Sequence, residues 1–283
     1  MKTLLCFGFG FFAKTLADRL AGEGFRVLGT TRTIDKTNGW PAYVEPLIFG
    51  SSQPLKTSVL AGVTHILTSI PPTDEGDPVL KAHLADLKAL TSLAWVGYLG
   101  TTAVYGDRQG AWVNEDDPIQ PTMPRAVRRA AAEQAWLGSG LPSHIFRLAG
   151  IYGPGRNPLL NVRAGKARRI DKPGQVFSRI HVADIASVLQ ASIAKPNPGS
   201  VYNVCDDEPA PPQDVVGYAA SLLGIKPPPL QPYETADLSP MARSFYLDNR
   251  RVSNEKIKRE LGVQLAFPTY RDGLDALLAD LTI

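Results

Sequence analysis

Residues 4–13 read Leu4-Leu5-Cys6-Phe7-Gly8-Phe9-Gly10-Phe11-Phe12-Ala13. An apolar run bounded by glycine is typical of a strand that is buried on both faces. Two glycines followed by apolar residues at helical spacing indicate a tight turn that leads into a helix. The stretch therefore predicts a buried strand, a glycine turn and a helix in immediate succession.

The glycine turn has the spacing Gly8-x-Gly10-x-x-Ala13. Gly8 permits the tight turn, Gly10 lets a pyrophosphate approach the backbone, and Ala13 is small enough for close helix–strand packing. The N–H groups at the start of the helix, at Phe11 and Phe12, would face the phosphates. We therefore predict dinucleotide binding, and the alternative is an ordinary strand–helix turn.

The second predicted strand ends with Thr30-Thr31-Arg32. An NAD site usually has an acidic residue here for the ribose hydroxyls, whereas a guanidinium can neutralise a ribose phosphate. We therefore predict that Thr31 and Arg32 favour NADP. NAD is the alternative, since Arg32 could point into water and Asp35 could supply the acid.

Strands and helices alternate through the first half of the chain. The predicted strands are 3–7, 25–31, 43–49, 62–70, 93–99 and 143–148, and the predicted helices are 11–21, 77–90 and 125–137. Strands separated by helices pair in parallel through right-handed crossovers. The fold class is therefore α/β, with a Rossmann-type doubly wound parallel sheet that binds ligand at the carboxyl ends of its strands.

The pattern changes after Gly150, where proline and glycine cluster between helices predicted at 182–194, 214–223, 253–261 and 270–281. We interpret this half as a smaller C-terminal substrate lobe. Residues 1–150, with about 176–204, form the predicted NAD(P)-binding Rossmann domain. Residues 151–175 and 205–283 form the predicted substrate-binding lobe.

Composition excludes several other classes of protein. The 283 residues are 44% apolar and 20% charged with a net charge of +3, which predicts a packed core and no nucleic-acid partner.

No stretch approaches eighteen apolar residues, so no membrane span is expected, and a cytoplasmic location follows by default. The four histidines lack ligand spacing, so no metal site is expected. The two cysteines are expected to be buried thiols.

The basic residues are scattered, with short pairs at Arg128-Arg129, Arg168-Arg169 and Arg250-Arg251. A nucleic-acid interface would gather such residues on one face, and the sequence does not show that arrangement. We interpret these arginines as part of a solvated surface.

Several further segments share a pattern with a known family. They are Gly100-Thr101-Thr102-Ala103-Val104-Tyr105-Gly106, Arg147-Leu148-Ala149-Gly150-Ile151-Tyr152-Gly153-Pro154-Gly155-Arg156, Arg179-Ile180-His181-Val182-Ala183-Asp184-Ile185-Ala186, Val201-Tyr202-Asn203-Val204 and the segment 249–262. Together with the glycine turn, they resemble the extended or atypical short-chain dehydrogenase/reductases, the NAD-dependent epimerase/dehydratase family. The resemblance spans nearly the whole chain, in order.

The resemblance implies roles for particular residues. Thr101 matches the catalytic Ser/Thr that hydrogen-bonds a substrate oxygen near the nicotinamide. The family's Tyr-x-x-x-Lys pair is missing, because Arg125 and Arg129 stand at its two positions. Arginine stays protonated and is a poor general acid or base. Arg129 could still hold the ribose or a phosphate, and Arg125 could hold an anionic substrate or stabilise an oxyanion.

Other residues could take part in the site. Tyr105, four residues after Thr101, is a candidate for the missing proton donor, with Tyr152 less favoured. The alternative is that both rings pack against the loop and hydrogen-bond the backbone. Ser69 and Pro71 end the fourth predicted strand, where their backbone could contact the cofactor or simply stop the strand.

The sequence thus predicts an NAD(P)-binding oxidoreductase or epimerase-like enzyme acting on a small polar carbonyl or sugar-type substrate. The alternative is a non-catalytic dinucleotide-binding sensor or regulatory protein, which the missing tyrosine favours. The family resemblance also implies a homodimer that pairs through helices 77–90 and 125–137.

Overall fold

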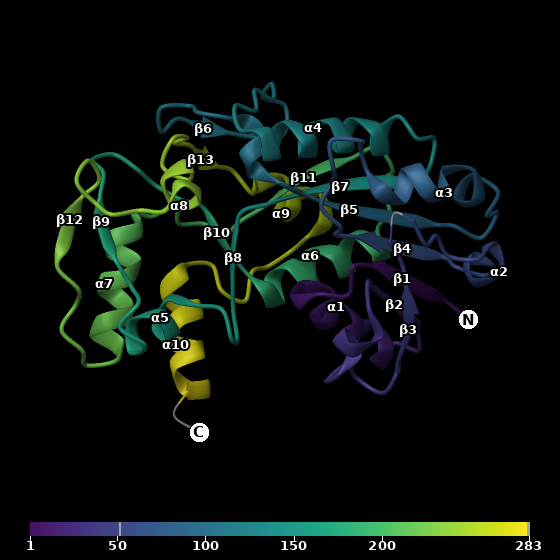
Figure 1. The fold of residues 1–283 in the computed structure, drawn as a ribbon, viewed down its shortest axis with the longest axis horizontal. Coiled ribbons are helices and arrows are strands. Elements are labelled where there is room, and N and C mark those ends of the chain that lie inside the picture. Colours follow the sequence, from purple (N-terminus) through teal and green to yellow (C-terminus); the bar gives the residue numbers. More distant parts are fainter. Residues whose placement is uncertain (51, 282–283) are drawn as a thin grey trace.

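A central parallel sheet organises the computed structural model, which describes residues 1–50 and 52–281. Its strand order is β11-β7-β5-β4-β1-β2-β3, and every neighbouring pair is parallel (Figure 1). The strands are β1 Thr3–Phe7, β2 Arg26–Thr31, β3 Val44–Ile48, β4 His65–Thr68, β5 Trp95–Thr101, β7 Ser143–Leu148 and β11 Val201–Val204. The predicted doubly wound, Rossmann-type fold is therefore confirmed.

The direction of the strand order reverses between β1 and β4, which are hydrogen-bonded neighbours. From β1 the chain moves outward to β2 and β3, and then returns to β4 on the other side before continuing to β5 and β7. Loops that leave β1 and β4 therefore diverge over opposite faces of the sheet. A parallel sheet opens its ligand crevice at such a point, at the carboxyl ends of the strands.

Helices cover both faces of the sheet, above and below it in Figure 1. One face holds α1 Phe11–Gly22, α6 Val182–Ala194 and α9 Glu255–Leu261, whose buried residues share a core with β1, β5 and β7. The other face holds α2 Thr57–Leu60, α3 Pro78–Lys88 and α4 Pro124–Leu137. Asp77 caps α3, because its carboxylate accepts from the N–H groups of Val79 and Leu80.

A second apolar core lies away from the sheet. It joins α5 Pro158–Arg163, α7 Pro212–Leu222 and α10 Tyr270–Leu281. The remaining short elements are η1 Ile34–Thr37, η2 Thr102–Tyr105, β6 Trp112–Val113, β8 Gly150–Tyr152, β9 Arg169–Asp171, β10 Arg179–His181, β12 Leu230–Pro232, α8 Pro240–Ser244 and β13 Arg251–Val252. One helix of the predicted substrate lobe, α9, does not join this second core. Its residues Ile257 and Leu261 pack into the core beside the sheet.

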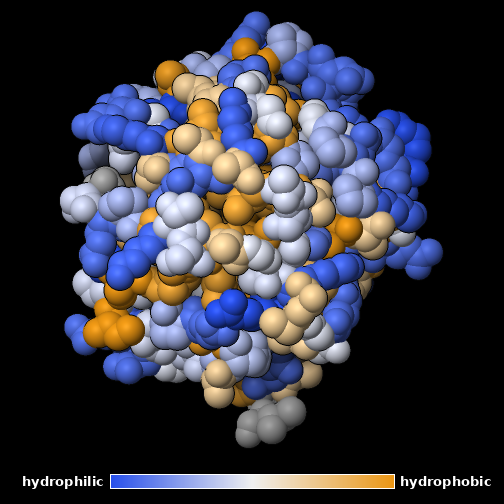
Figure 2. Space-filling model, turned by 90° about the vertical axis from the view of Figure 1, so that its right-hand side faces the viewer, coloured by the Kyte–Doolittle hydropathy of each residue, from blue (hydrophilic) through white to orange (hydrophobic). Residues whose placement is uncertain are grey.

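Both apolar and hydrophilic residues are present on the surface of the molecule. Figure 2 shows the side on which α2 and α3 lie, with apolar side chains gathered near its centre and hydrophilic ones around them. Within residues 1–50 and 52–281, no helix combines the length and hydrophobicity needed to cross a bilayer. Pairing of two chains through α3 and α4 stays a prediction.

Candidate functional site

The glycine turn ties together the ends of three strands. Gly8 has φ of +87°, in the left-handed region that favours glycine, and a Cβ there would lie 2.7 Å from Ser69 Oγ. Its N–H donates to Thr30 Oγ1 at 2.8 Å, and its carbonyl accepts from Ser69 Oγ at 2.9 Å. The predicted residues Gly8 and Ser69, which directly follow β1 and β4, are therefore in contact.

The backbone beside Gly10 is open. A Cβ built on Gly10 would meet no atom within 4 Å, and Gly10 is exposed. Gly10 is also the N-cap of α1, and no side chain caps the first N–H groups of that helix. Free N–H groups beside open space at a helix start fit the phosphates of a dinucleotide. The Phe11 ring lies close to Gly153, since a Cβ built on Gly153 would lie 3.2 Å from it.

The end of β2 lies next to the glycine turn. Thr31 Oγ1 donates to the carbonyl of Thr33 at 3.1 Å, and Arg32 is exposed at the surface. Arg32 is therefore accessible to a phosphate placed along this strand end.

A cavity of about 1130 Å³ opens at the carboxyl end of β5 and extends between the sheet and the C-terminal segments. Thr101, Arg125, Arg129 and Pro71, all predicted site residues, line it. The structure thus brings three of the predicted catalytic residues, Thr101, Arg125 and Arg129, to one cavity. Pro71 also lines this cavity, two residues after Ser69, which contacts Gly8.

Arginine dominates the charge of this cavity. The arginines that line it are Arg125, Arg128, Arg129, Arg156, Arg168, Arg179 and Arg250. Among the described lining residues, Asp248 is the only carboxylate. The interpretation of the arginine pairs as solvated surface is therefore wrong in part, because each of the three pairs contributes at least one member to the lining. These residues come from distant segments, so their meeting is not visible in the sequence.

Arg129 is anchored, whereas Arg125 is comparatively free. Arg129 Nη1 donates to the carbonyl of Leu99 at 2.8 Å, on the strand that ends at Thr101. Arg125 lies one helical turn earlier on the same face of α4. Its guanidinium carbon lies 4.3 Å from the centre of the Phe245 ring. In the part of the chain that the structure describes, no carboxylate lies within ion-pair distance of either guanidinium.

Thr101 ends β5 at the cavity wall. Its hydroxyl oxygen accepts from the N–H of Ala103 at 3.2 Å, at the start of η2. A hydroxyl has one proton to donate and two lone pairs to accept with. This contact uses one lone pair, so the Thr101 proton can still be donated to a substrate oxygen.

Tyr105 lies in the core rather than in the cavity. Its side chain is fully buried, and its hydroxyl donates to Asn203 Oδ1 at 2.8 Å and accepts from Arg147 Nη1 at 2.7 Å. Arg147 in turn forms a buried ion pair with Glu133 of α4. Burial raises the pKa of Tyr105 to about 12. This placement favours the structural alternative, with side chains instead of the backbone as partners. The second tyrosine, Tyr152, lines the cavity, but burial raises its pKa as well.

The comparisons with known proteins agree with this architecture. No protein-family model matches the chain. A structure from Silicibacter pomeroyi, of a conserved protein of unknown function, is 55% identical, with a TM-score of 0.93 and 99% of each chain covered. A candidate NAD-dependent epimerase/dehydratase from Methylobacillus flagellatus is 27% identical, with a TM-score of 0.77 over 100% of this chain and 99% of that one. The chain is thus similar to a protein described as an NAD-dependent epimerase/dehydratase, the group that its sequence motifs resemble.

A curated relative from Escherichia coli is similar to this chain over nearly its whole length. Protein YeeZ from Escherichia coli is 28% identical over 285 residues, covering 95% of this chain and 97% of YeeZ. The assignment of Arg125 and Arg129 to the tyrosine and lysine positions of the family's catalytic pair stays a prediction from the sequence motif. Both arginines line the cavity.

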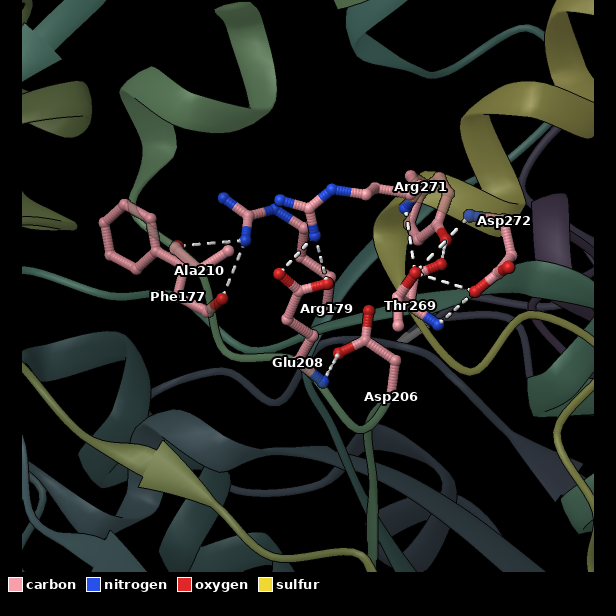
Figure 3. A network of polar contacts seen from close by, with 9 residues as sticks. Phe177, Arg179, Asp206, Glu208, Ala210, Thr269, Arg271 and Asp272 are labelled. Atoms are coloured by element: carbon pink, nitrogen blue, oxygen red, sulfur yellow. Dashed lines mark hydrogen bonds and ion pairs between the residues drawn. The ribbon is translucent and has the colours of Figure 1, made fainter. Parts of the chain in front are cut away.

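A second polar network lies where the C-terminal segments meet the sheet (Figure 3). Arg179 donates to the carbonyls of Phe177 and Ala210 at 2.8 and 3.1 Å, while Arg271 pairs with Glu208. Asp206 is 1% exposed, and its Oδ1 accepts from the N–H of Glu208 at 3.3 Å. In the described chain, its Oδ2 has no hydrogen-bond partner. Burial therefore raises the pKa of Asp206 to about 8, although the charge of Arg179 acts in the opposite direction.

We expect Tyr105→Phe to destabilise the protein without abolishing any turnover. The change leaves Arg147 Nη1 and Asn203 Oδ1 without a buried partner, which costs about 1–3 kcal/mol of unfolding free energy. Chemical denaturation measures this loss. Tyr218→Phe is the control, because it removes a hydroxyl bonded to Asp275 at the surface, where the cost is small. Loss of turnover with unchanged stability would instead assign Tyr105 to catalysis.

We expect Asp206→Asn to stabilise the protein in a pH-dependent way. The unfolded carboxyl loses its proton near its ordinary pKa of 3.8, whereas the folded one keeps it until about pH 8. Ionisation therefore favours the unfolded state as the pH rises. The stability gained by Asp206→Asn should grow between pH 4 and 8 and then level off in denaturation curves. Asp116→Asn makes the same change at an exposed position and is the control. A difference in unfolding free energy between Asp206→Asn and the unmodified protein that stays constant from pH 4 to 8 would contradict this account.

Proposed function

We propose that this protein is an NAD(P)-dependent oxidoreductase or epimerase-like enzyme that acts on a small polar carbonyl or sugar-type substrate. One observation carries the proposal: the glycine turn and the Thr101 cavity open at the same edge of the sheet and are joined through Ser69 and Pro71. The similarity to a candidate NAD-dependent epimerase/dehydratase over the whole chain supports the same function.

The residues present fit a dinucleotide. The N–H groups after Gly10 would hold the diphosphate, since the space beside Gly10 is open. Arg32, exposed at the end of β2, would pair with a ribose phosphate, which supports NADP over NAD. When bound, the dinucleotide supplies or accepts a hydride.

The cavity side chains would then hold the reacting group. Thr101 would donate its hydroxyl proton to the substrate oxygen and fix the orientation of the carbonyl. Arg129, held by the Leu99 carbonyl, would stabilise negative charge that develops on that oxygen, because a fixed cation in a partly enclosed site requires little reorganisation. Arg125 would hold an anionic part of the substrate or share that role. Neither guanidinium supplies a proton readily, so the proton donor differs from that of relatives with the tyrosine.

We expect the protein to bind NADPH about tenfold more tightly than NADH, measured by titration of the reduced cofactors' fluorescence. A charge-assisted pair between Arg32 and the extra phosphate provides the difference, which corresponds to about 1.4 kcal/mol. Arg32→Ala should remove the preference, whereas Lys36→Ala on η1 should preserve it. Tighter binding of NADH by the unmodified protein would show that Arg32 has no such role.

We expect Thr101→Ala to lower kcat by about 10²-fold on a substrate found by screening NADPH consumption against carbonyl compounds. Thr101→Ser keeps the hydroxyl and should retain most of the activity. The affinity for NADPH should be the same in all three proteins. Tight cofactor binding without turnover of any carbonyl would favour the non-catalytic sensor, for which the loss of the tyrosine is the specific observation.

A further inference from the structure

The cavity has an excess of positive charge that its own side chains do not neutralise. Arg128 pairs with Asp74 outside the cavity at 2.8 Å, and Arg250 pairs with Asp248 at 3.3 Å. Arg125 has no such partner in the described part of the chain, although it is half-buried and lines the cavity. A guanidinium in that position gains most from an anion that the solvent or a ligand provides.

The position of Arg125 specifies where that anion would lie. Arg129, one turn further along α4, is fixed to the Leu99 carbonyl, two residues before Thr101. The Arg125 side chain therefore lies at the Thr101 end of the cavity, on the same face of α4. The guanidinium carbon of Arg125 lies 4.3 Å from the centre of the Phe245 ring. In the described chain the Arg125 N–H groups have no hydrogen-bond partner, so they are available for a planar, two-point contact.

Phe245 lies beside the Arg125 guanidinium in the cavity lining. It is 53% exposed and follows α8, and Met241 of the same helix is 68% exposed. Both residues line the cavity, so the anion-binding edge of Arg125 lies beside an apolar wall. Neither side chain offers a hydrogen bond to a bound anion, so the Arg125 guanidinium is the group there that would bind it.

We propose that the substrate carries an acidic group, a carboxylate or a phosphate, next to its reacting carbon, and that Arg125 binds this group in a two-point contact. The inference rests on the proposed function, because it names the substrate class of the same cavity. Arg125 is then a specificity-determining residue: it selects acidic carbonyl compounds over neutral ones at the position where a proton donor stands in relatives.

The test uses calorimetry on the protein saturated with NADPH, so that the glycine turn is occupied. The probes are malonate, inorganic phosphate and malonamide, the neutral isostere of malonate. We expect malonate or phosphate to bind and malonamide not to bind, and the stronger of the two anions identifies the acidic group. Arg125→Met should weaken the binding of that anion at least tenfold, and Arg125→Lys by less, because the charge remains but the planar fork is lost.

Arg156→Met is the matched control, since it removes the same charge from the loop after β8, in another part of the lining. It should change anion affinity less than threefold. Equal losses in Arg156→Met and Arg125→Met, or equal binding of malonamide and malonate, would overturn the inference. Thermal unfolding and NADPH titration of each variant separate the two proposals. Normal NADPH binding without anion binding overturns the acidic substrate alone, whereas absence of NADPH binding in the unmodified protein overturns the proposed function.

Discussion

The close approach of Gly8 to Ser69 is the constraint on which the rest of the site depends. A side chain at position 8 would collide with Ser69 Oγ, and the two hydrogen bonds of Gly8 connect it to the ends of β2 and β4. Three strand ends therefore share one fixed point at the place where the strand order reverses. The start of α1 projects from that point on one side, and the segment that includes Pro71 reaches the large cavity on the other.

The second constraint is electrostatic. A cavity lined by many arginines and a single carboxylate is an unfavourable arrangement for the empty protein, because like charges repel in a partly enclosed space. Folded proteins retain such arrangements where a ligand of opposite charge compensates them. The proposed role of Arg125 therefore concerns more than the source of a proton. It concerns the kind of molecule that the Thr101 end of the cavity would hold.

Much of the fold could be predicted from local patterns. Apolar runs bounded by glycine or proline identified the strands β1 to β5 and β7, and helical spacing identified α1, α3, α4, α6, α7, α9 and α10 to within a few residues. The helices α2, α5 and α8 have four to six residues each, too few to show a period, and were not predicted. Packing of α9 against the sheet could not be predicted either, since its partners β11 and α6 lie tens of residues earlier.

Some residues of the candidate site could likewise be predicted from local patterns, and others could not. Gly8, Gly10, Thr101, Arg125 and Arg129 could be found, because each belongs to a short motif with a fixed spacing. The burial of Tyr105 could not, since it depends on Asn203, which lies 98 residues away in the sequence. The gathering of arginines around the cavity was missed for the same reason. The sequence of the pair Arg250-Arg251 does not show that Arg250 lines a cavity formed by distant segments.

The central claim is that backbone N–H groups at the start of α1 bind the diphosphate of a dinucleotide. A crystal structure of the protein with NADPH tests it most directly. The account predicts the diphosphate beside Gly10 and the first turn of α1, with the nicotinamide at the Thr101 end of the cavity. A glycine turn that stays empty at saturating NADPH, or a cofactor bound elsewhere on the molecule, would contradict it.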